Sequence, residues 1–260
     1  PSTDVARYRA GDLDMTSYAL PPEQFAKLQK ELPGEVFTTR TLATYSYELN
    51  NKKAPFDNVN VRKALNLSLD RNVITDKVLG QGQTPTYVFT PTYIEEGHLI
   101  QQPAYSKEPM AQRNEEAIKL LEEAGYSKAN PLKFSILYNT NENHKKVAIA
   151  AASMWKANTK GLIDVKLENQ EWKTYIDSRR AGRYDAARAG WNADYNQATT
   201  FGNYFLSNSS NNTAKYANPE YDKAIAESYV ATDAEGRAKA YAKAEEILAK
   251  DFGIVPIFNY

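Results

Sequence analysis

Short stretches rich in β-branched and aromatic residues, several of which alternate apolar with polar positions, predict β-strands. The longest runs from Val36 to Leu49, and we expect it to form one strand or two in line. The alternation is clearest in "LKFSILY", where Leu132, Phe134 and Ile136 share one face. Three more strands are expected in "LIDVKLE" at 162–168, "YDAARAGW" at 184–191 and "GIVPIF" at 253–258.

Between these stretches the apolar positions recur every three or four residues, which predicts amphipathic helices. Val61, Leu65, Leu69 and Val73 lie on one face of a continuous helix that we expect to end at Gly80. A second helix is expected in "RNEEAIKLLEEAGY", with Ala117, Leu120, Leu121 and Ala124 buried and Gly125 as its C-terminal cap. Further helices are expected over 144–157, 172–182, 221–229 and 235–250.

The order of these elements predicts an α/β fold with a mixed β-sheet flanked by helices. The segment from Gln81 to Pro109 is rich in proline and threonine and has little periodicity. Long loops of this kind inside compact domains are often functional.

Composition narrows the classes of function. The chain has 260 residues, and 32 basic residues balance 32 acidic ones, which argues against a nucleic-acid partner. The absence of cysteine permits an oxidising compartment. No signal peptide is visible at Pro1, and we expect the chain to be a piece of a longer protein at both ends. The 18 tyrosines fit either ordinary core filling or a ligand cleft.

The residues for most enzymatic chemistry are missing. Without cysteine, and with only His98 and His144 at unrelated spacing, neither a zinc site nor a cysteine nucleophile is expected. No phosphate-binding glycine motif and no nucleophile elbow occur, so we expect no cofactor. The enzymatic alternative is a carboxylate-pair hydrolase that uses Glu171, Asp185 or Asp194.

The stretch "ARAGWNADYN" carries a cation, a large aromatic ring and a carboxylate close together. Strand alternation places Arg188 and Gly190 on one face, and Asp194 falls in a turn after the strand. A strand end with a core Trp191 explains this pattern as well as a ligand site does. Upstream, Trp172 and Arg179 share one face of a predicted helix, where a simple cation beside an aromatic ring would suffice.

Several motifs together resemble a known family. "PFDNVNVRKALNLSLDRNVI", "RNEEAIKLLEEAGY" and "RAKAYAKAEEILAKDFGIVPIFNY" are similar to motifs of the periplasmic substrate-binding proteins of peptide and nickel ABC transporters. "LYNTNENHKKVAIAAASMWK" and the region around "ARAGWNADYN" resemble the oligopeptide-binding branch of that family more closely still. The resemblance covers essentially the whole chain.

This resemblance implies a periplasmic, monomeric binding protein and not an enzyme. Family members have two lobes that close over an extended peptide and deliver it to the membrane permease subunits of an ABC importer. By resemblance, residues 1–40 belong to the other lobe and residues 41–260 form the peptide-binding lobe, truncated before the chain returns to the first lobe. A hinge strand is then expected near 41–47.

The resemblance also implies roles for individual residues. Asp194 matches the carboxylate that pairs with the peptide α-ammonium, and Gly190, Trp191 and Asn192 match the strand that bonds the peptide main chain. The remaining matches are Arg188 and His144 for the peptide carboxylate, and Trp172, Arg179 and Glu48 for side-chain pockets. Asn192 stands where the oligopeptide-binding branch of enteric bacteria has a cysteine, a change that should matter little because the position acts through its main chain.

Two alternatives stay open beside transport. The first is the carboxylate-pair hydrolase. The second is a peptide sensor or chaperone built on the same fold, which the sequence alone does not separate from a transport protein.

Overall fold

The computed structural model describes residues 2–16 and 20–260, and its central feature is one mixed sheet with the strand order β2-β6-β1-β5-β3-β4. β3 runs parallel to β4 and β5, whereas β1 runs antiparallel to β5 and β6. The expected mixed α/β fold is therefore confirmed. The strands are β1 (Ala43–Leu49), β2 (Thr84–Pro85), β3 (Leu132–Asn139), β4 (Ile163–Gln170), β5 (Ala186–Asn192) and β6 (Ile254–Asn259).

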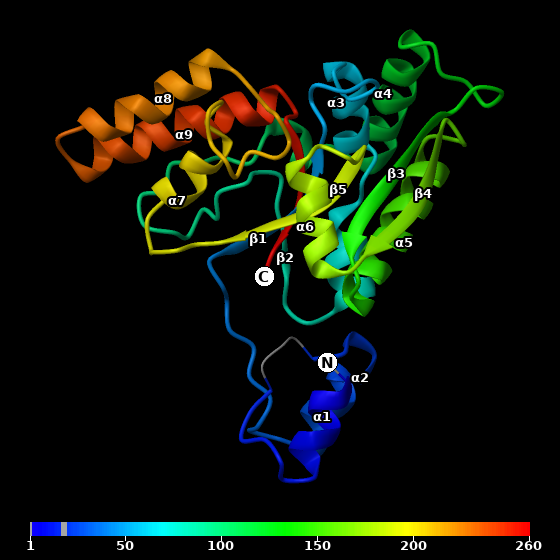
Figure 1. Ribbon diagram of the computed structural model, residues 1–260, viewed down its shortest axis with the longest axis vertical. Helices are drawn as coiled ribbons and strands as arrows, with labels where there is room; N and C mark the ends of the chain where they lie inside the picture. Colours follow the sequence, from blue (N-terminus) through cyan, green and yellow to red (C-terminus); the bar gives the residue numbers. More distant parts are fainter. Residues whose placement is uncertain (1, 17–19) are drawn as a thin grey trace.

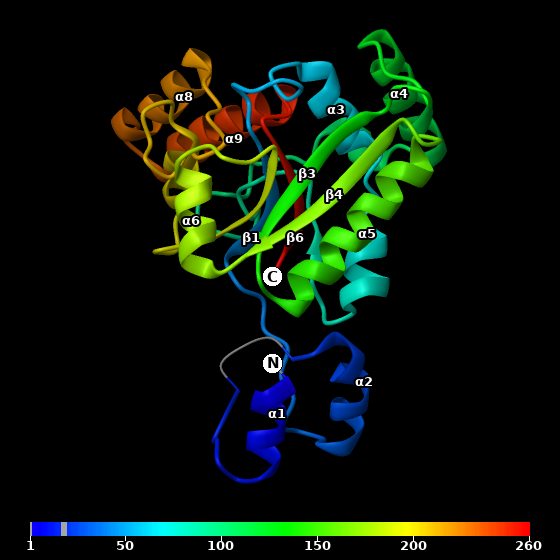
Figure 2. The same cartoon turned by 45° about the vertical axis from the view of Figure 1, so that its right-hand side comes forward.

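Helices cover both faces of this sheet (Figures 1 and 2). One face packs against α3 (Val59–Leu67), α4 (Met110–Glu123) and α5 (Glu142–Asn158), and their apolar side chains form the larger core. The other face packs against α6 (Trp172–Arg180), α7 (Thr199–Gly202), α8 (Pro219–Val230) and α9 (Ala234–Lys250). All seven residues of β1 are buried because both of its faces are covered.

Two predictions from periodicity are wrong. The strand expected from Val36 begins only at Ala43, because residues 36–40 are mostly exposed and no described strand pairs with them. Thr41 and Leu42 make only isolated main-chain bonds, to Tyr260 and Ala193. The helix expected up to Gly80 breaks after Leu67. Ser68 turns its hydroxyl onto the Ala64 carbonyl at 2.7 Å, and a separate π-helical segment, Val73–Leu79, follows.

The two arginines of the "VRKAL" and "DR" motifs have structural roles. Arg62 donates to the main-chain carbonyls of Phe56 and Asp251, at 2.8 and 2.7 Å. Arg71 is fully buried and donates to the carbonyl of Pro256 at 2.7 Å. A guanidinium offers five donors in a fixed fork, so each arginine can satisfy several carbonyls at once. Arg62 joins α3 to the turn that follows α9, and Arg71 joins the segment after α3 to the last strand, β6.

The N-terminal segment carries α1 (Ser2–Arg9) and α2 (Pro22–Glu31), which lie apart from the sheet in both views (Figures 1 and 2). Phe37, in the stretch that joins this segment to β1, is 78% exposed. The assignment of residues 1–40 to another lobe stays a prediction. Among the residues that the structure describes, no helix has both the length and the apolar character to cross a bilayer.

Candidate functional site

β5 has an open edge over its second half. It pairs with β1 along its whole length, but on its other side it pairs with β3 only at Ala186 and Ala187. Because the Ala193 amide donates to Leu42 on the β1 side at 2.8 Å, antiparallel alternation turns the main-chain groups of Gly190 and Asn192 toward the open side. These two residues can therefore accept an added strand.

Arg188 and His144 meet on one face of β5. The Arg188 guanidinium lies 5.0 Å from the centre of the Tyr45 ring, and the His144 ring lies 5.5 Å from the same ring. Arg188 donates to the Tyr260 hydroxyl at 2.9 Å, and its buried Nε has no hydrogen-bond partner within the described residues. The guanidinium thus retains donor capacity for an anion.

Gly190 makes room for this guanidinium. A Cβ atom at Gly190 would lie 3.3 Å from Arg188 Nη2 and 3.2 Å from the Thr44 carbonyl oxygen. The predicted common face of Arg188 and Gly190 is confirmed. Because Gly190 has no side chain, the Arg188 side chain can lie along the strand. The main chain of Gly190 faces the open edge.

The imidazole of His144 is held neutral. Burial, reinforced by the nearby Arg188 guanidinium, lowers the pKa of His144 from 6.5 to about 3. The side chain therefore enters the site uncharged at neutral pH and can donate one hydrogen bond without adding a second cation beside Arg188.

This shift predicts an acid-sensitive contribution to stability. An unfolded chain protonates His144 below about pH 6.5, whereas the folded chain does so only near pH 3, so stability should fall as pH drops between these values. In urea unfolding at pH 7.0, 5.5 and 4.5, His144→Gln should remove a slope of up to about 1.4 kcal/mol per pH unit. His98→Gln removes an imidazole from an exposed site and serves as the control. This variant should keep the slope of stability with pH. Identical slopes in the wild type and His144→Gln would contradict the shift.

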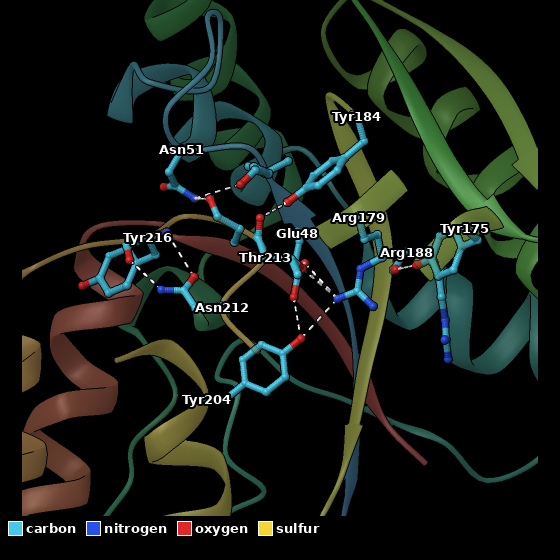
Figure 3. A network of polar contacts seen from close by, with 12 residues as sticks. Glu48, Asn51, Tyr175, Arg179, Tyr184, Arg188, Tyr204, Asn212, Thr213 and Tyr216 are labelled. Carbon is cyan, nitrogen blue, oxygen red and sulfur yellow. Dashed lines mark hydrogen bonds and ion pairs between the residues drawn. The ribbon is translucent and has the colours of Figure 1, made fainter. Parts of the chain in front are cut away.

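Glu48 and Arg179 form an ion pair on the opposite face of the sheet (Figure 3). Their closest atoms are 2.9 Å apart, and Glu48 has no exposed surface. Tyr204 donates to one carboxylate oxygen at 2.7 Å, and Thr213 donates to the other. Burial, the largest single influence, would lower the pKa of Arg179, but Glu48 together with the neighbouring Tyr175 and Tyr204 outweighs it and raises that pKa above its ordinary value. In this chain Glu48 can influence a ligand only through its partners.

The remaining predicted residues lie around the end of β5 and the start of α6. Trp191 donates from its indole to Thr200 Oγ1 at 3.0 Å and packs edge-on against Tyr204. Trp172 is 56% exposed and stacks on Tyr175. Asp194 is exposed, its amide donates to Thr200 Oγ1 at 3.3 Å, and its carboxylate forms no ion pair with the described residues.

The structure places Arg188 and Asp194, but not Glu48 and Arg179, along the open edge of β5. Arg188 and Asp194 are six positions apart on a nearly extended chain, a distance of about 20 Å, and the open edge lies between them. Sequence analysis missed Tyr45 and Tyr260, which support Arg188. Tyr45 sits in a predicted strand, but nothing in the sequence indicated that its ring would contact both Arg188 and His144.

The carboxylates considered for a hydrolase do not have the geometry of a catalytic pair. Asp185 precedes β5 and Asp194 follows it, so a seven-residue strand of about 23 Å separates them. A glycosidase pair requires about 5–10 Å. Asp185 is also tied to Lys53 at 2.7 Å and to the Ser135 amide at 3.1 Å. Glu171 follows β4, which β3 separates from β5.

The chain is similar to several known proteins. The family model described as "Bacterial extracellular solute-binding proteins, family 5 Middle" matches residues 1–213. The "Periplasmic oligopeptide-binding protein OppA" of Haemophilus influenzae is 96% identical over 100% of this chain and 48% of its own length. The protein of the same name from Salmonella typhimurium is 52% identical over 99% of this chain and 47% of its own length.

A solved structure matches as well. It is described as the Haemophilus influenzae OppA complex with RPPGFSPFR, and it aligns with a TM-score of 0.98 and 95% identity over 100% of this chain and 51% of that one. These names describe binding proteins, and none describes an enzyme. The chain spans about half the length of the curated relatives that it matches.

Proposed function

The chain belongs to the bacterial extracellular solute-binding proteins of family 5, and on that premise we propose that it forms the peptide-binding lobe of a periplasmic oligopeptide-binding protein. The observation that carries the proposal is the open edge of β5, with the Arg188 guanidinium at one end and, beyond the other, the Asp194 carboxylate, which pairs with none of the described residues. The complete, two-lobed protein would deliver its peptide to the permease subunits of an ABC importer.

The peptide adds a strand to β5. With its α-ammonium at Asp194 and its carboxylate toward Arg188 and His144, it runs antiparallel to β5 and bonds the main chains of Gly190 and Asn192. Every peptide carries these groups, so recognition through them accepts many sequences. The charged contacts become strong once the second lobe excludes water from them.

Side-chain pockets flank this strand. Trp172 offers an exposed aromatic face, and Trp191 lies beside the main-chain contacts. Glu48 and Arg179 both bond the Tyr204 hydroxyl, and the Tyr204 ring packs against Trp191. The ion pair therefore acts on the pocket beside Trp191 through Tyr204. Water held in roomy pockets can adapt to different side chains, which suits a binder of low sequence selectivity.

Titration calorimetry with a lysine-rich tripeptide tests the proposal. The full-length protein should bind with submicromolar affinity and return the peptide intact, as mass spectrometry of the released ligand will verify. This 260-residue chain alone should bind at least about 100-fold more weakly, because the ligand is then buried from one side only. Hydrolysis of the peptide, or no binding by the full-length protein, would overturn the function. Submicromolar binding by the isolated chain would overturn the requirement for a second lobe.

A further inference from the structure

The turn that carries Asp194 is fastened to the long loop between β2 and α4. The Ala198 amide donates to the Glu95 carbonyl at 3.0 Å, and the Glu95 amide donates to Asn196 Oδ1 at 3.2 Å. These reciprocal bonds hold residues 194–198 against residues 91–97. Asp194 itself is bonded through its amide to Thr200, and its carboxylate has no partner in residues 2–16 and 20–260.

Glu96 is the side chain at the centre of this contact. Its side chain is 4% exposed, and its Oε2 accepts from Gln197 Nε2 at 2.9 Å. Its backbone has φ 65°, a conformation that a non-glycine residue adopts at an energetic cost of about 1 kcal/mol or more. The local strain is therefore offset by the contacts of the carboxylate.

Arg237, in the first turns of α9, anchors Glu96 from the other side. Its Nε and Nη2 lie 2.8 and 2.7 Å from Glu96 Oε1. The ion pair is shielded on the Glu96 side, so it is worth more than an exposed surface pair. The same loop is held near the expected hinge, where the Tyr93 hydroxyl donates to the Thr41 carbonyl at 2.7 Å.

We propose that Glu96 is a positioning residue for peptide binding: bridging Arg237 and Gln197, it fixes the turn that aims the Asp194 carboxylate at the peptide α-ammonium. This inference rests on the proposed function. The route runs from α9 through Arg237, Glu96 and Gln197 to the turn. Glu96 does not touch the peptide.

The physical reason is the exposure of Asp194. An exposed carboxylate on an irregular turn samples many positions, and ordering it on binding costs free energy. A turn that is already held in place reduces that cost. We call the contacts of Glu96 with Arg237 and Gln197 the brace. The brace should affect the ammonium contact alone. It should leave the main-chain contacts at Gly190 and Asn192 unchanged, because β1 fixes those residues through the sheet.

Glu96→Gln tests the inference, because it keeps the side-chain shape and the backbone preference but removes the charge that Arg237 binds. In the full-length protein, affinity for a free tripeptide should fall about 3- to 10-fold, whereas affinity for its N-acetylated form should change less than twofold. Arg237→Gln should act in the same direction. Glu95→Gln is the matched control: the same change, one residue away, on an exposed side chain, with no expected effect.

A double-mutant cycle separates positioning from general stability. In the Asp194→Asn background, Glu96→Gln should no longer change the ratio of free to acetylated affinity. Equal weakening of both peptides by Glu96→Gln, or an unchanged ratio, would overturn the proposal. If Asp194→Asn itself leaves the ratio unchanged, the proposed role of Asp194 fails and this inference fails with it.

Hydrogen exchange on this 260-residue chain without peptide reports on the brace itself. The Ala198 amide should exchange about 10-fold faster in Glu96→Gln than in the wild type, because its bond to the Glu95 carbonyl opens more often. Glu95→Gln should leave that rate unchanged. Unchanged exchange in Glu96→Gln would show that no brace exists, whatever the outcome for the peptides.

Discussion

Replacement of Asp194 by asparagine should weaken the binding of a free tripeptide to the full-length protein by about 30- to 4,000-fold. The range corresponds to the loss of about 2–5 kcal/mol when one partner of a desolvated charge pair is truncated. Asparagine keeps the size and one oxygen of the side chain, so the loss reports on the charge. Calorimetry with the peptide in free and N-acetylated forms measures it.

The acetylated peptide is the internal reference. It has no α-ammonium, so the wild type should bind it weakly and Asp194→Asn should change its affinity by less than about threefold. Asp177→Asn, at an exposed position on α6, controls for the loss of one negative charge and should alter neither affinity. An equal loss for both peptides in Asp194→Asn would refute the ammonium role.

The elements with a single dominant pattern could be predicted from the sequence. β3 alternates buried and more exposed positions from Leu132 to Ile136, and α4 ends where Gly125 adopts a positive φ of 93°. The break after Leu67 could not be predicted in this way, because Leu65 and Leu69 keep helical spacing across it. There the Ser68 hydroxyl bonds the Ala64 carbonyl of the preceding turn, and the Asp70 carboxylate accepts from the amides of Asn72 and Val73 near the start of the next helical segment.

The candidate site, too, could be predicted from the sequence only in part. Alternation correctly placed Arg188 and Gly190 on one face, and the resemblance supplied the remaining candidates. Neither revealed that β3 leaves β5 after Ala187, which creates the open edge. That feature depends on the register and divergence of strands distant in sequence, and so does the contact between Glu96 and the Asp194 turn.

Glu48 and Arg179 give the clearest case of a residue whose surroundings decide its role. The resemblance placed both in side-chain pockets, yet Glu48 is wholly buried and accepts from Tyr204, Thr213 and Arg179 (Figure 3). Removal of one member of such a pair leaves an uncompensated charge in the interior. Glu48→Ala should therefore lower the free energy of unfolding of this chain by about 3–5 kcal/mol, measured by urea denaturation at pH 7.

A matched control and a double variant identify the cause of that loss. Glu168→Ala removes the same side chain from an exposed position on β4 and should cost less than about 1 kcal/mol. Glu48→Met alone and Arg179→Met alone should each destabilise as Glu48→Ala does, since each leaves the other member of the pair charged and unpaired. Glu48→Met combined with Arg179→Met removes both charges, so its cost should be well below the sum of the single variants. Strict additivity, or a Glu48→Ala cost equal to that of Glu168→Ala, would show that the pair does not stabilise the fold in this way.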